Sequence, residues 1–201
     1  MKTFSILLIS LIAGVSVTYQ PVRAQAVKVE TVHDLPADPA NNDPQSGRPL
    51  GATNRFTFFS LKDGKQVPNS DSATANWDIG FRSTTIIVNG GTGRAGKGGA
   101  YIHNGTFESL TAVPENAAFS VDQSLTQLAI PAGSGNGWYT YGGGVIAPTP
   151  EKVLVIRTAD GKYAKLEVLG YYKGGPDGPG SESRYYTFRY AYQPDGSRKL
   201  D

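Results

Sequence analysis

The sequence predicts an all-β domain, an antiparallel sandwich or barrel-like fold with long glycine-rich loops and little helix. Three observations support this prediction. Apolar and polar residues alternate in several short stretches, most clearly in Tyr185–Tyr192. Asp-Gly pairs, which favour tight hairpin turns, separate some of these stretches. No long apolar stripe of helical period runs through the chain, and this disfavours a helical fold.

The strongest strand signals lie between Lys152 and Tyr192. Val153–Ile156 is a short β-branched run, and Asp160-Gly161 is predicted to form a two-residue hairpin turn after it. A turn there sets Val155 opposite Leu166 and Val153 opposite Val168, so that these four residues form one apolar face. That face continues with Arg157 and Ala164, while Lys165 and Glu167 fall on the other face.

A third strand, Tyr185–Tyr192, is expected to complete this sheet. Its apolar side is fully aromatic and consists of Tyr186, Phe188, Tyr190 and Tyr192. Thr187 and Arg189 fall on the opposite side. Three strands that share one apolar face can support a fold, whereas an isolated hairpin is only marginally stable.

The preceding chain predicts further strands separated by loops. Arg55–Lys62 and Lys65–Val67 form a second hairpin signal around Asp63-Gly64. Trp77–Arg82 alternates, and Thr84–Val88 is β-branched, so both are expected to be strands. Glycine-rich loops are expected at three places, namely Gly90–Gly99, Gly133–Gly144 and Gly174–Ser183.

Three segments are expected along the chain. Residues 1–26 are a signal peptide, because Lys2 precedes the short apolar run Phe4–Val17 and Ala24-Gln25-Ala26 fits a cleavage site. Residues 27–54 are rich in Pro, Asn and Asp and predict a loose N-terminal lead-in. Residues 55–201 form the β domain, a length that suits one domain.

Export sets the expected compartment, which is periplasmic or extracellular. The apolar run Phe4–Val17 is too short for a membrane span. The sequence contains no Cys, so no lipid anchor attached through a cysteine is expected. Removal of residues 1–26 takes away Lys2 and Arg23 and no acid, which brings the formal charge from +2 to zero. A neutral chain lacks the basic surface that binding of nucleic acid requires.

The motifs do not favour an enzyme. Gly91–Gly98 resembles a phosphate loop, but Gly98 stands where Mg²⁺ binding needs Ser or Thr, and the following residues predict a strand rather than a helix. No Cys and no nucleophile elbow are present, and His33 and His103 are the only imidazoles. Tyr139 and Tyr141 lie among glycines, where they either close over a flat ligand or anchor the loop.

The chain resembles the HmuY-like family of exported haem-binding proteins from Bacteroidetes. The resemblance rests on NWDIGFRSTTIIVNGG (Asn76–Gly91), VLVIRTADGKYAKLEVLGYYK (Val153–Lys173) and RYYTFRYAYQPDGS (Arg184–Ser197), together with Phe58–Leu61. It implies an all-β fold and a non-enzymatic role in iron acquisition. The implied partners are haem, whose iron is held between paired His or Met side chains, and an outer-membrane haem receptor.

This chain departs from the family's ligand pattern. Its only Met is Met1, and Trp138–Ile146, where a second ligand is expected, contains no His. His103 is therefore the predicted metal ligand, and Tyr139 and Tyr141 are the predicted cofactor-binding residues, because a phenolate can ligate haem iron. The expected function is capture of haem through an altered site. The alternative is a family member that has lost haem and binds another ligand or a surface protein.

Overall fold

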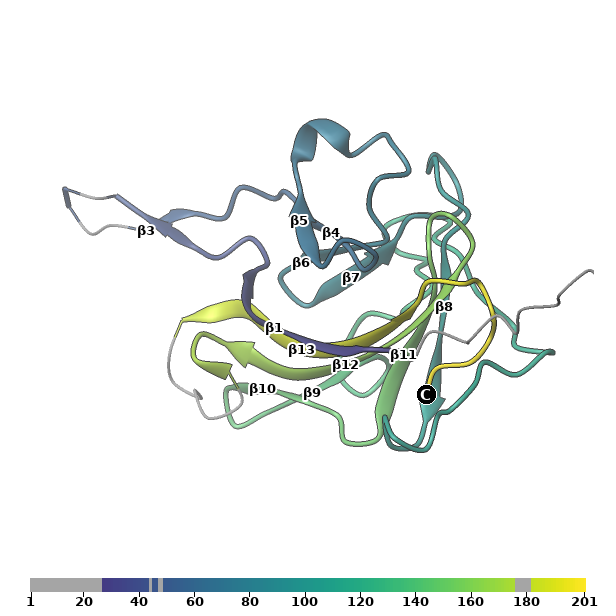
Figure 1. Cartoon of the computed structure of the whole chain (residues 1–201). Coiled ribbons are helices and arrows are strands. Elements are labelled where there is room, and N and C mark those ends of the chain that lie inside the picture. The colour runs from purple at the N-terminus through teal and green to yellow at the C-terminus, as the bar shows by residue number, and fades with distance from the viewer. Residues whose placement is uncertain (1–26, 44, 47–48, 176–181) are drawn as a thin grey trace, which may run out of the picture.

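Two antiparallel sheets pack face to face around the main apolar core (Figure 1). The computed structural model describes residues 27–201 apart from 44, 47–48 and 176–181. The expected signal peptide lies outside this part of the chain, as does most of the third predicted loop. The fold is all-β and sandwich-like, which confirms the predicted class. Within the described ranges, no helix is both long and apolar enough to cross a membrane.

The larger sheet has five strands, and the three C-terminal strands that were predicted to form one sheet lie at its centre. In spatial order the strands are β1 (Val29–Pro36), β13 (Ser183–Gln193), β12 (Tyr163–Tyr172), β11 (Lys152–Arg157) and β8 (Gly99–Asn104). The aromatic side of β13 faces the main core, where Tyr186, Phe188 and Tyr190 are buried. Burial of these rings supplies much of the apolar contact between the sheets.

The smaller sheet has four strands and covers one face of the larger one (Figure 1). Its spatial order is β5 (Lys65–Val67), β4 (Thr57–Ser60), β6 (Ile79–Arg82) and β7 (Thr85–Val88). The predicted hairpin at Asp63-Gly64 is confirmed: Ser60 pairs with Lys65, and Gly64 has a φ of +63°. Phe59 and Phe81 reach across the core to Phe188, with ring centroids 5.5 and 5.4 Å away.

Two small ribbons and a short helix complete the regular structure. The ribbons are β2 (Asn41–Asn42) with β3 (Pro49–Gly51) and β9 (Tyr139–Gly142) with β10 (Val145–Pro148), and the 3₁₀ helix is η1 (Asn69–Asp71). The β2–β3 ribbon projects away from both sheets (Figure 1). Asp38 anchors its base, because its carboxylate accepts hydrogen bonds from the backbone N–H groups of Thr53 and Asn54.

The predicted register of the β11–β12 hairpin is wrong by one residue. Leu154 pairs with Leu166 and Val155 with Lys165. The cause is the turn, which has three residues rather than two: Thr158 N–H donates to the Lys162 carbonyl, and only Gly161 has a positive φ, +86°. This loop length is typical of a type I turn followed by a glycine bulge. The core face therefore carries Leu154 and Ile156 in place of Val153 and Val155.

The expectation of a loose lead-in is wrong for β1. This strand pairs with β13 along the edge of the larger sheet, and Leu35 and Ala37 are buried. Few apolar residues mark it, because only the end of the strand reaches the core. A register shift between Val32 and Leu35, with Asp34 at a φ of +51°, breaks the alternation that would have revealed it.

The second glycine-rich loop contains a hairpin that was not predicted. Gly142 pairs with Val145, and the two residues between them, Gly143 and Gly144, have φ values of +58° and +81°. Positive φ at both positions is the requirement of a two-residue type I′ turn. The glycines therefore specify a tight turn, and Tyr139 and Tyr141 lie on a strand.

Candidate functional site

The β9–β10 ribbon and the end of β12 enclose an apolar pocket of about 160 Å³. Its walls are Val145, Ile146, Ala147, Pro148, Leu169, Gly170, Tyr171, Tyr172 and Gly175. The ribbon is fixed to β12 by a hydrogen bond of 3.0 Å from the Ile146 N–H to the Tyr172 hydroxyl. One wall of the pocket is therefore the hairpin and the other is the main sheet.

Buried aromatic rings pack between the ribbon and the larger sheet. Trp138 contacts Tyr139, Tyr171 and Tyr186, with ring centroids 4.9, 5.8 and 5.0 Å apart. The indole N–H of Trp138 donates to the Thr84 carbonyl at 3.0 Å, which ties this cluster to the smaller sheet. Burial raises the pKa of both Tyr171 and Tyr186, so these phenols stay protonated and serve as packing groups.

Tyr139 and Tyr141 differ in exposure although both lie on β9. Tyr139 is buried in the main core, whereas the Tyr141 side chain is 61% exposed. The Tyr141 N–H donates to the Ser134 hydroxyl at 2.8 Å, which fixes the strand but leaves the phenol outside. Val145, on the paired strand, is also exposed. The ribbon thus exposes Val145, which lines the apolar pocket, and Tyr141, which pairs with the wall residue Ile146 but does not itself line the pocket.

His103 lies on a different surface. It is on β8, the edge strand of the larger sheet, opposite Val153 of β11. Directly paired residues share a face, and Val153 belongs to a second cluster with Phe107 and Leu110. Tyr139 packs in the main core on the other face. The structure therefore does not bring His103 and Tyr139 together, and Gly105 lies beside the His103 ring instead.

His33 also differs from expectation, since it lies on β1 next to the register shift and is exposed. Over the residues that the structure describes, no three His, Cys, Asp or Glu side chains are grouped to hold a metal ion.

Sequence reasoning missed the walls of the apolar pocket. Leu169–Tyr172 was given no site role, and of the β10 wall residues only Val145 and Ile146 fall within Trp138–Ile146, where a second ligand is expected from the sequence. The pair Gly143-Gly144 between apolar flanks was an available hairpin signal. A hairpin folded there places Val145 and Tyr141 on one small ribbon, but its packing against β12 is a long-range contact that no local pattern encodes.

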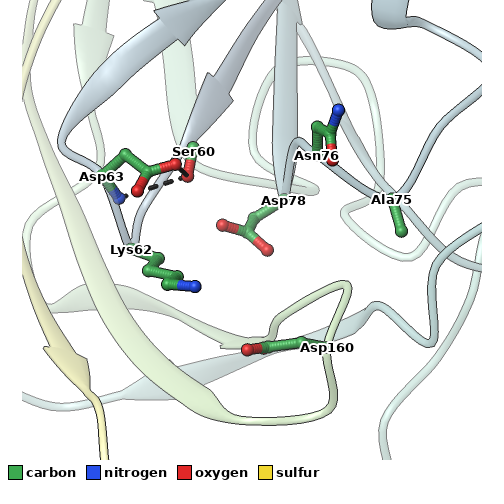
Figure 2. Close-up of a pocket in the computed structure, with 7 residues that line it drawn as sticks. All are labelled: Ser60, Lys62, Asp63, Ala75, Asn76, Asp78 and Asp160. Atoms are coloured by element: carbon green, nitrogen blue, oxygen red, sulfur yellow. Dashed lines mark hydrogen bonds between the residues drawn. The ribbon is translucent and has the colours of Figure 1, made fainter.

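A separate, polar cavity of about 170 Å³ lies where turns from the two sheets meet (Figure 2). Asp78 is at its centre and is buried; its two carboxylate oxygens accept the N–H groups of Leu61 and Ala159, each at 2.8 Å. Asp63 points toward Ser60, whose hydroxyl donates to it at 2.9 Å. These carboxylates are engaged by the protein, and Asp78 connects the turn after β4 with the turn after β11.

The fold and the ribbon define an all-β protein with an apolar surface site. A family model described as HmuY protein matches residues 52–190, more than half of the chain. The chain therefore belongs to the HmuY family, which confirms the resemblance. A comparison with curated proteins gives no match.

Solved structures of low sequence identity are similar to this chain, and one of them, with a TM-score above 0.5, shares its fold. An HmuY-like heme binding protein from Bacteroides vulgatus is 17% identical, with 82% of this chain and 92% of that chain covered and a TM-score of 0.51. The apo HmuY analog from Tannerella forsythia is 16% identical, covering 87% and 100%, with a TM-score of 0.47. Apo PinO from Porphyromonas gingivitis is 15% identical, covering 88% and 100%, with a TM-score of 0.45.

Proposed function

We propose that this protein is an exported, non-enzymatic haem-binding protein that captures haem for uptake through an outer-membrane receptor. Membership of the HmuY family carries the proposal. The relative from Bacteroides vulgatus, described as heme binding, supports it through the shared fold. The periplasm or the cell exterior is the proposed place of action, in line with the expected signal peptide.

The β9–β10 ribbon is the proposed contact with haem. Its pocket is apolar, as the edge of a porphyrin requires, and the exposed phenol of Tyr141 supplies an oxygen donor of the kind that ligates haem iron. The pocket volume of about 160 Å³ is smaller than the roughly 300–1,000 Å³ of sites that enclose an organic ligand. The residues therefore fit one edge of haem, and the rest of the ring would lie on the surface.

His103, the iron ligand expected from the sequence, is not part of this proposed contact. Because it is on the opposite face of the larger sheet from Tyr139, it cannot complete the same site without rearrangement of the sheet. This separation favours the second candidate function, in which the pocket binds a different apolar ligand or a surface protein and haem binding has been lost. The two functions predict different results with hemin.

Titration of the purified protein with hemin separates them. The haem proposal predicts a shifted Soret band that saturates at one haem per chain. Val145→Asp should weaken binding, because it places a charge beside the apolar pocket. Leu50→Asp is the matched control, since Leu50 is an exposed aliphatic residue on the other ribbon, β2–β3. Absence of a saturable band in the wild type would support the second function.

Titration with iron-free protoporphyrin IX tests whether the iron contributes to the affinity for haem. Coordination by Tyr141 predicts that the wild type binds hemin more tightly than protoporphyrin IX. Tyr141→Phe should remove this difference, since it retains the ring and loses only the oxygen. Equal binding of both porphyrins by the wild type would show that the apolar pocket acts without an iron ligand.

A further inference from the structure

An open groove of about 550 Å³ lies at the end of the larger sheet away from the β9–β10 ribbon. The Gly91–Gly98 loop lines one side, and the turn between β11 and β12 lines the other. The turn lies just before the first residue of β12, and the apolar pocket lies at the other end of the same strand. At about 3.3 Å per residue, the two sites are about 25 Å apart along the strand.

Two cationic side chains line this groove. The Arg157 Nε–H donates to the Lys97 carbonyl at 2.8 Å, and its guanidinium lies over the Phe119 ring at 5.4 Å. These contacts hold the guanidinium in place and leave its terminal N–H groups without a hydrogen bond to any described residue. Lys97 is exposed, and its ammonium forms no ion pair with any residue that the structure describes.

Among the residues that the structure describes, Asp160 is the one acid that lines the groove, and it is paired with a cation of its own. Asp160 accepts a hydrogen bond of 2.6 Å from the Thr158 hydroxyl and lies 3.7 Å from the Lys162 ammonium. The groove therefore has an excess of positive charge from Lys97 and Arg157. A guanidinium held in place and an exposed ammonium that line the same groove form an arrangement that binds oxyanions.

The glycine loop is rigidly attached to the protein. The Asn89 side chain is fully buried; it accepts the Gly96 N–H at 3.2 Å and donates to the Thr74 and Trp77 carbonyls. The Gly98 N–H donates to the Asn89 carbonyl at 2.8 Å, and a Cβ on Gly98 would lie 2.6 Å from that oxygen. Glycine is therefore required for this close approach, and the loop forms a preorganised wall.

We propose that this groove is a binding site for a phosphate-type oxyanion, held by Arg157 and Lys97. The loop is not a nucleotide-binding P-loop, because it leads into strand β8 rather than a helix. The site is separate from the proposed haem site and goes beyond the proposed function. A free phosphorylated small molecule and a lipid headgroup share this chemistry.

Calorimetric titration with inorganic pyrophosphate at low ionic strength tests the site. Saturable binding is expected, and Arg157→Gln should weaken it about tenfold, as expected for loss of a charged hydrogen-bond donor. Lys97→Gln should weaken it about threefold through loss of one exposed charge. Lys65→Gln, on the far edge strand of the smaller sheet, should leave the affinity unchanged.

A charge-retaining variant and a vesicle-binding experiment complete the test. Arg157→Lys retains the charge but lacks the planar fork, so it should bind more weakly than the wild type. Co-sedimentation with phosphatidylcholine vesicles that contain phosphatidic acid identifies a headgroup source, whereas binding of pyrophosphate alone identifies a free ligand. Absence of saturable binding by the wild type overturns the proposal. Because Lys97 is exposed and its loss should not affect folding, unchanged affinity in Lys97→Gln and Arg157→Gln overturns it too.

Discussion

At the scale of single residues, Asp78 connects the two halves of the sandwich. Its carboxylate accepts one backbone N–H from the turn after β4 and one from the turn after β11. Burial raises its pKa above the ordinary value of 3.8, although the hydrogen bonds from Ala159 and Leu61 act in the opposite direction. Desolvation of the charged form therefore outweighs its two backbone contacts.

This raised pKa has a consequence for stability that depends on pH. A folded-state pKa above the unfolded value means that the folded protein takes up the proton first as pH falls. The wild type should therefore gain stability relative to Asp78→Asn as pH falls from above the raised pKa to 3.8. Urea unfolding of both proteins across that range measures the difference in the free energy of unfolding. A difference that is constant or shrinks with falling pH would contradict this account.

Gly161 is a second residue with a defined conformational role. Its φ of +86° closes the three-residue turn between β11 and β12, and a Cβ there would meet only Lys97, at 3.9 Å. Space is therefore available, and the cost of substitution is backbone strain. Gly161→Val should lower the free energy of unfolding by about 1–3 kcal/mol.

Gly142→Ala provides the control for that measurement. Gly142 is not among the residues with positive φ, and no atom lies within 4 Å of a Cβ placed on it. Its urea midpoint should stay close to that of the wild type. If Gly161→Val also leaves the midpoint unchanged, the turn does not require glycine.

At the scale of elements, β1 is the edge strand that protects β13. Within β1, Leu35 is only 6% exposed and belongs to the main core, whereas Val29 is 51% exposed. Leu35→Ala should destabilise the protein by about 2–4 kcal/mol, because it removes buried apolar volume. Val29→Ala on the same strand should change the urea midpoint little. Equal effects of the two substitutions would show that β1 does not dock as described.

The sequence predicted most elements and two of the hairpins, but not the register of β11–β12 or the pairing of β1. Alternation identified Tyr185–Tyr192 correctly, because its aromatic side faces the core without interruption. The register of β11–β12 depended on whether Ala159 belonged to the strand or to the turn, and Asp160-Gly161 suits turns of two or three residues equally. β1 escaped prediction because its contacts are with β13, far away in the sequence.

At the scale of the whole molecule, the two proposed binding sites lie at opposite ends of β12. The apolar pocket depends on β10 packing beside Leu169–Tyr172, and the cationic groove depends on the loop after β7 meeting the β11–β12 turn. Residue types alone suggested His103, Tyr139 and Tyr141 as one site. Strand pairing determines which face each side chain occupies, and it separates His103 from Tyr139.

Hemin titration of His103→Ala beside Tyr141→Phe tests most directly whether the ribbon binds haem. The account predicts a saturable Soret band in the wild type, affinity retained in His103→Ala and reduced in Tyr141→Phe, and a wild-type spectrum unlike that of bis-imidazole haem. Affinity lost in His103→Ala and retained in Tyr141→Phe would contradict it and place haem at the β8 edge of the larger sheet.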